Sequence, residues 1–305
     1  MLGIWPALAH CIQTNQTPMI YLLAAIVCGA FISISFKLFR KFGIDSLQGI
    51  FVNYITAMAV SVALSGQGVN LGAIFGTSFS SSWLWLAIVE GFFFMGGIVV
   101  MSVSTQRSGL AITNVAGRAS MIIPVVASWL VYRQGSPRWL LIAIIICSMI
   151  LIFSKSADKQ KLRAADIVPP LGVFFFFGIC DFLLKVLKSR LGDTPEGNAM
   201  LFIFSTAALF CLLAYLLRGH YREHPLDWKA IPGGIFLGLM NSGCTALMMK
   251  ALGVMDAAVF FPCYNVGVVL VTLLTGIFAF REKLRGIQFA GIATALAAMV
   301  LLLTI

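Results

Sequence analysis

Long apolar runs alternate with short polar breaks along almost the entire chain. A helix needs about 20 mostly apolar residues to cross the hydrocarbon core of a bilayer, and in lipid only a helix or a closed barrel satisfies its backbone hydrogen bonds. The short alternating segments of a membrane β-barrel are absent from the sequence. The pattern therefore predicts an all-α integral membrane protein with ten membrane-spanning helices, at residues 19–39, 47–66, 83–104, 108–131, 138–154, 166–187, 198–217, 232–252, 255–280 and 285–304.

The composition agrees with this pattern. Hydrophobic residues make up 60% of the 305 positions and charged residues only 10%, whereas about 25% of a soluble domain is charged. The net charge of +10 would suggest nucleic acid as a partner of a soluble protein. Here the basic residues fall mainly between the apolar runs, where they are expected on the cytoplasmic side of a membrane. We therefore expect contact with a lipid bilayer and none with nucleic acid.

The residue types of common enzyme sites occur without their usual spacing. Six of the seven cysteines lie inside apolar runs and none forms a CxxC pair, while the three histidines lie outside the runs. Neither HExxH nor GxSxG occurs, which argues against a membrane metalloprotease or serine hydrolase. We therefore expect no metal site, no cofactor, no catalytic residues and no enzymatic activity.

Polar residues recur between the two halves of the chain at an offset of 148 positions (185 minus 37). Such matches at three separate places are harder to attribute to chance than matches between apolar runs. They pair Lys37 with Lys185, Arg40 with Lys188, residues 45–49 with 193–197, and residues 133–134 with 281–282. The offset predicts an internal repeat of about half the chain.

Five helices in each half are an odd number, so the second half must enter the membrane from the opposite side. The prediction is two inverted five-helix repeats around a central cavity, an arrangement typical of secondary transporters. The repeats are expected at 19–154 and 166–305, with a basic linker at 155–165. Residues 1–18 are an N-terminal extension of unclear role, and Met19 is an alternative start.

Two indications of orientation disagree. The breaks that face one side carry most of the lysines and arginines, and the positive-inside rule then puts both termini outside the cell, in a multi-pass protein of the inner (plasma) membrane. The second indication comes from residues 246–260 and 280–291, which include Glu282 after the ninth run and lead into a glycine-rich tenth run. These stretches resemble EamA-type permeases of the drug/metabolite transporter superfamily. The resemblance implies a ten-helix basket that moves metabolites, with cytoplasmic termini, so the absolute orientation stays open.

The first half departs from the pattern that carries the resemblance. Gln134 stands where the repeat offset puts Glu282, and Asn114 stands where it puts Pro262. Pro262 matches a proline common in the ninth helix of that family.

Ionisable residues deep inside apolar runs cost several kcal/mol unless they face a partner or a cavity. Asp181 and Lys185 are four positions apart, so they share one helix face and can pair. This pair is either structural or a gate that a proton or a charged substrate opens. Glu90 is the obvious partner of Arg118, which alternatively binds an anionic group of a substrate, because a guanidinium suits carboxylate and phosphate.

Neutral polar residues and prolines inside the runs add further candidates. An asparagine within a membrane span is either a helix–helix contact or a ligand for a substrate. Proline frees a backbone carbonyl and bends its helix. The polar candidates are Asn114, Asn241, Tyr264 and Asn265, with Asn53 as a further packing residue, and the helix-bend candidates are Pro124 and Pro262.

These observations favour a secondary transporter for a small organic solute, with protons as candidate coupling ions because of the buried carboxylates. A phosphate-binding Walker sequence is absent. One alternative is a membrane sensor or assembly subunit with a transporter-like fold, and another is a membrane-embedded transferase. The solute, its direction of movement, the coupling ion and the choice between monomer and homodimer stay open.

Overall fold

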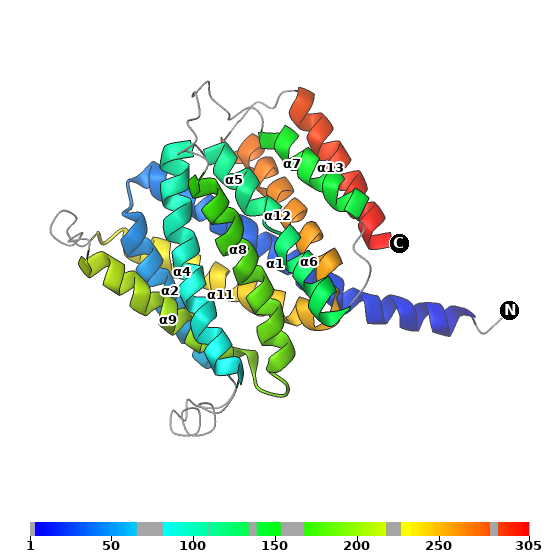
Figure 1. Ribbon diagram of the computed structural model, residues 1–305, viewed down its shortest axis with the longest axis horizontal. Coiled ribbons are helices and arrows are strands. Elements are labelled where there is room, and N and C mark those ends of the chain that lie inside the picture. Colours follow the sequence, from blue (N-terminus) through cyan, green and yellow to red (C-terminus); the bar gives the residue numbers. More distant parts are fainter. Residues whose placement is uncertain are drawn as a thin grey trace.

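The computed structural model describes residues 4–65, 82–108, 110–133, 139–153, 168–217, 227–280 and 286–304. These ranges contain helices and no strand (Figure 1), which confirms the predicted all-α class. The helices are α1 (Ile4–Phe42), α2 (Ser46–Leu64), α4 (Ser82–Ser108), α5 (Leu110–Ala119), α6 (Ile122–Tyr132), α7 (Trp139–Phe153), α8 (Val168–Arg190), α9 (Glu196–Leu217), α11 (Ala230–Val254), α12 (Ala257–Phe280) and α13 (Gly286–Thr304).

Six helices in the described ranges are long and apolar enough to cross a membrane. Their spanning stretches are Pro18–Phe36, Ser46–Leu64, Trp83–Met101, Val168–Arg190, Glu196–Leu217 and Ala230–Val254. The remaining predicted spans correspond to shorter apolar helices, at Ala116–Tyr132, Trp139–Ser148, Ala257–Thr272 and Phe289–Ala298. The chain is a multi-pass membrane protein.

Helix α1 joins the N-terminal extension to the first predicted span. It has 39 residues, which at 1.5 Å per residue is about 58 Å, roughly twice the thickness of the hydrocarbon core. The first part of α1 projects from the helical bundle (Figure 1). The predicted boundary at residue 19 therefore lies inside one continuous helix.

The fourth predicted span is interrupted between α5 and α6. The chain leaves helical geometry at Ser120 and Met121, four and three positions before Pro124. Proline has no N–H, and its ring clashes with the carbonyl four residues earlier. The carbonyl of Ser120 instead accepts a hydrogen bond of 2.9 Å from the N–H of Ile123. Helix α12, in contrast, continues through Pro262 to Phe280.

Helix α2 has different neighbours at its two ends. At its start, the Asp227 N–H donates to Gln48 Oε1 (2.7 Å), which holds the approach to α11. At its end, Gly197 of α9 lies so close that an added Cβ would be 2.5 Å from the Ser61 oxygen and the Ser65 nitrogen. The turn at 43–45 and the turn at 191–195 therefore lie at opposite ends of α2.

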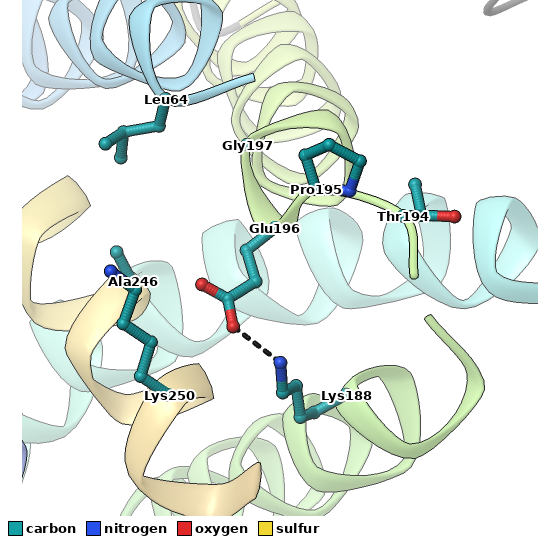
Figure 2. Close-up of a pocket in the computed structure, with 8 residues that line it drawn as sticks. All are labelled: Leu64, Lys188, Thr194, Pro195, Glu196, Gly197, Ala246 and Lys250. Atoms are coloured by element: carbon teal, nitrogen blue, oxygen red, sulfur yellow. Dashed lines mark hydrogen bonds and ion pairs between the residues drawn. The ribbon is translucent and has the colours of Figure 1, made fainter. Parts of the chain in front are cut away.

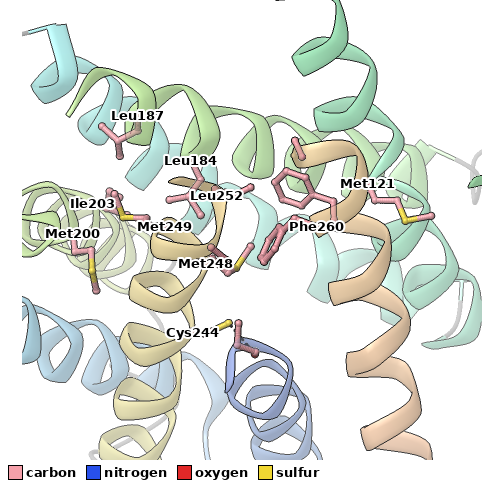
Figure 3. Close-up of a cluster of buried hydrophobic side chains, with 14 of the residues drawn as sticks. Met121, Leu184, Leu187, Met200, Ile203, Cys244, Met248, Met249, Leu252 and Phe260 are labelled. Atoms are coloured by element: carbon pink, nitrogen blue, oxygen red, sulfur yellow. Dashed lines mark hydrogen bonds between the residues drawn. The ribbon is translucent and has the colours of Figure 1, made fainter. Parts of the chain in front are cut away.

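Methionine and leucine side chains fill the region between α8, α9 and α11. Met248, Met249 and Leu252 of α11 lie between residues of α8 and residues of α9 (Figure 3). Methionine is flexible and adapts to irregular gaps. This part of the core is therefore suited to repacking when neighbouring helices move.

Helices α11 and α2 pack backbone against backbone at Gly238. A Cβ at Gly238 would lie 2.6 Å from both the Asn53 oxygen and the Thr56 Cβ, whereas a Cβ at Gly243 of the same helix would meet only Cys28 Sγ, at 3.7 Å. We expect Gly238→Ala to lower the free energy of unfolding by about 1–3 kcal/mol through overpacking. Gly243→Ala is the control and is expected to change stability little. Apparent melting temperatures in detergent provide the measurement, and equal values for the two variants would contradict the prediction.

Candidate functional site

Arg118 lies in the last turn of α5, directly before the helix interruption. Its side chain is half-buried, and Nη1 donates a hydrogen bond of 3.1 Å to Asn265 Oδ1. Asn265 is only 3% exposed, and its Nδ2 donates to the Phe261 carbonyl oxygen at 2.9 Å. This second bond holds the Asn265 amide, so α12 presents an oriented oxygen to the guanidinium.

Arg118 interacts electrostatically with Asp181 on α8. It also interacts with Tyr264 and Cys244. Within the described residues, no carboxylate forms an ion pair with Arg118, so the hydrogen bond to Asn265 occupies only one of its five N–H donors. The guanidinium therefore keeps donors for an anionic group.

Glu90 of α4 also interacts with Asp181. It is 1% exposed, and its Oε2 has no hydrogen-bond partner among the described residues. The described contacts include no ion pair between Glu90 and Arg118. The expected Glu90–Arg118 bridge is therefore not formed, because α12 brings Asn265 to the guanidinium instead.

Lys185 is also held by a partner other than the expected one. Its Nζ donates a hydrogen bond of 2.7 Å to the carbonyl oxygen of Leu252, in the last turn of α11. The last carbonyls of a helix have no partner within the helix and attract cations. The interpretation as an Asp181–Lys185 ion pair is wrong for this structure, since the shared helix face does not bring the two charges together.

Tyr264 adds a hydroxyl group next to Arg118. The hydroxyl and Cys244 Sγ share a hydrogen bond of 3.3 Å, and the Tyr264 ring stacks on Phe260 with centroids 5.8 Å apart. Cys244 lies inside an apolar run of the sequence. Nothing in its spacing along the chain indicates this contact with α12.

The other polar candidates lie apart from Arg118 or outside the description. Asn241 Nδ2 donates to Asn53 Oδ1 at 3.2 Å, and both residues are buried. This pair joins α11 to α2 and fits the packing role. The side chain of Asn114 lies outside the described residues, as do Gln134, Glu282 and the predicted linker at 155–165.

The structure thus gathers Arg118, Asp181, Tyr264 and Asn265 from α5, α8 and α12, and Glu90 of α4 interacts with Asp181. This set is called the Arg118 cluster below. It offers a guanidinium for an anionic group and carboxylates that can carry a proton. Across the described residues, no group of three His, Cys, Asp or Glu side chains could hold a metal ion.

Comparison with known proteins relates the chain to a transporter family. Residues 168–304 match the model of the EamA-like transporter family. The second half of the chain is therefore similar to the EamA-like transporter family. This EamA-like domain contains Asp181, Tyr264 and Asn265, and it agrees with the resemblance noted in the sequence. The similarity indicates a membrane transporter of the drug/metabolite superfamily.

Whole-chain similarities extend beyond the EamA-like domain. An uncharacterized protein of Haemophilus influenzae (strain ATCC 51907 / DSM 11121 / KW20 / Rd) is 26% identical over 288 residues, which cover 91% of this chain and 95% of the relative. A protein crystal structure superposes with a TM-score of 0.70 and 14% identity, covering 94% of this chain and 96% of the other. The fold of that crystal structure therefore includes both the first half of the chain and the EamA-like domain.

Proposed function

We propose that the protein is a secondary transporter that moves a small organic solute with a carboxylate or phosphate group across the inner (plasma) membrane. The observation that carries this proposal is Arg118. It lies at a break in a membrane helix, held by Asn265 and next to Asp181, with most of its donors unoccupied by described residues. A guanidinium in that position binds an anionic group in a bidentate manner.

The helix interruption supports the same location for the solute. Transporters commonly bind their substrates where a membrane helix is discontinuous, because the break frees backbone groups near the bilayer midplane. Here α5 ends at Ala119 and α6 begins at Ile122. The solute is then bound between α5, α8 and α12, on side chains from both halves of the chain.

Two inverted repeats, at 19–154 and 166–305, are part of the proposal. Equivalent helix pairs at the 148 offset both pack together: α1 with α11, and α8 with α4. The turns at 43–45 and 191–195, which the offset relates, lie at opposite ends of α2. This packing supports a pseudo-twofold axis in the membrane plane, around which the two halves rock.

The inverted topology predicts opposite accessibility of two exposed turn positions. In intact cells, a membrane-impermeant maleimide is expected to label only one of Ser46→Cys and Asp193→Cys, because the two turns face opposite sides. The parent protein controls for labelling of its own cysteines. Labelling of both variants from the same side contradicts the inverted arrangement.

Coupling of solute movement to proton movement is a further part of the proposal. Asp181 interacts electrostatically with both Arg118 and Glu90, and one carboxyl oxygen of Glu90 has no hydrogen-bond partner among the described residues. A carboxyl group can take up or release a proton when the solute binds. It then couples the movement of the proton to the movement of the solute. The carboxylates of the Arg118 cluster are then coupling residues and not catalytic ones.

Solute flux in reconstituted vesicles tests the function. The purified protein is reconstituted, and uptake of radiolabelled amino acids, organic acids, phosphate esters, sugars and organic cations is compared with uptake by protein-free vesicles. We expect saturable uptake of one or more solutes that carry a carboxylate or phosphate. Uptake restricted to cations or neutral sugars would reject the role of Arg118, and no uptake of any solute would favour a sensor or assembly subunit.

A further inference from the structure

A pocket away from the Arg118 cluster opens where the ends of four helices meet. It has a volume of about 310 Å³ and lies between the ends of α2, α8 and α11 and the start of α9 (Figure 2). Small-molecule sites have volumes of about 300–1,000 Å³. The residues that line the pocket are Leu64, Lys188, Thr194, Pro195, Glu196, Gly197, Ala246 and Lys250.

The charges in this pocket are two ammonium groups and one carboxylate. Lys188 Nζ and Glu196 Oε1 form an ion pair of 2.5 Å, and their side chains are 24% and 18% exposed. Lys250, from α11, lines the same pocket, and its side chain extends along Ala246 (Figure 2). In the described chain no carboxylate pairs with Lys250, whose Nζ lies 5.9 Å from the centre of the Tyr21 ring. The lining therefore carries one more positive charge than negative charge.

Glu196 occupies the place that an external anion would take. It is the first residue of α9, where unpaired backbone N–H groups favour negative charge. We expect an anion in the pocket to contact Lys250 and to compete with Glu196 for Lys188. Thr194 also lines the pocket, but its hydroxyl points away from Lys188 and Glu196 (Figure 2).

We propose that the Lys188–Glu196–Lys250 pocket is a second binding site for a carboxylate or phosphate group, at the membrane face where α8 ends. The site is separate from the Arg118 cluster, because Lys188 is seven residues beyond Asp181 on α8, about 10 Å along the helix. It does not depend on the transport function. A free anion and the headgroup of an anionic lipid share the chemistry that the pocket recognises.

Charge-removing variants with opposite expected signs test the site. Binding of inorganic phosphate to the full-length protein in detergent is measured by phosphorus NMR line broadening at constant ionic strength. Lys250→Gln is expected to weaken phosphate binding about two- to fivefold, as for loss of one partly exposed charge contact. Glu196→Gln is expected to tighten phosphate binding by a similar factor, because it removes the competing carboxylate.

Lys41→Gln is the matched control, since Lys41 is an exposed lysine that also lies 5.9 Å from an aromatic ring, that of Phe42, and does not line the pocket. Equal effects of Lys250→Gln and Lys41→Gln, or weaker binding by Glu196→Gln, would overturn the proposal. The same titration in phosphatidylcholine nanodiscs with and without phosphatidylglycerol identifies the source of the anion. Weaker phosphate binding with phosphatidylglycerol assigns the site to a lipid headgroup, and unchanged binding assigns it to a free anion.

Discussion

Arg118→Lys is expected to reduce solute flux about 10- to 100-fold while the protein still folds and inserts. Lysine keeps the positive charge but loses the planar fork that bonds a carboxylate or phosphate through two parallel contacts. Hydrogen bonds to charged groups contribute about 1.5–3 kcal/mol, which corresponds to this range of flux. The substitution also removes the hydrogen bond that Arg118 Nη1 donates to Asn265 Oδ1.

The comparison for Arg118→Lys is Arg107→Lys, the same substitution at an exposed arginine in the last turn of α4. Both variants are reconstituted at equal density, and initial rates are measured with the solute that the wild-type protein transports. Arg107→Lys is expected to keep wild-type flux. Full flux by the Arg118→Lys variant would show that a point charge suffices and would reject bidentate recognition at this residue.

Asp181→Asn is expected to abolish the accumulation of solute that a pH gradient drives. If one proton moves with each solute, a gradient of one pH unit supports about a tenfold concentration ratio, because both correspond to about 1.4 kcal/mol. Asparagine has nearly the shape of aspartate but cannot carry the exchangeable proton. Exchange of labelled for unlabelled solute at equal pH is expected to continue, since it needs no net proton movement.

Asp193→Asn is the control for Asp181→Asn, because Asp193 is an exposed aspartate in the turn between α8 and α9. Glu90 is the second carboxyl group that faces Asp181, so it could substitute as the proton carrier. The double variant Asp181→Asn with Glu90→Gln removes that possibility. Gradient-driven accumulation that survives in the double variant would exclude both carboxyl groups from proton coupling.

Much of the architecture follows from the sequence because burial in lipid is a property of each segment by itself. A run of about 20 apolar residues is stable only in the bilayer, and its backbone is satisfied only as a helix. The all-helical membrane class could therefore be predicted, and it is confirmed. The resemblance to EamA-type permeases rests on short motifs in the second half, and the match of residues 168–304 agrees with it. The depth of Glu90, Arg118 and Asp181 within their runs likewise marked them as groups that need a partner.

The tertiary structure alone decided which partners those groups have. Spacing along one helix predicted that Lys185 would pair with Asp181, yet Lys185 bonds the carbonyl of Leu252, 67 positions away. Arg118 bonds Asn265, 147 positions away, and not Glu90 on the preceding span. Helical periodicity says which residues share a face, but the opposing helix, its rotation and its free carbonyls come from packing between distant segments.

The pocket at Lys188 depends on packing in the same way. Its lining comes from the ends of α2, α8 and α11 and the start of α9, and no local pattern connects Lys188 with Lys250. The sequence determined that these lysines lie near a membrane face, because the apolar runs end beside them. Only the fold decided that they share one cavity with Glu196, because a cavity exists only between helices whose crossing brings their ends together.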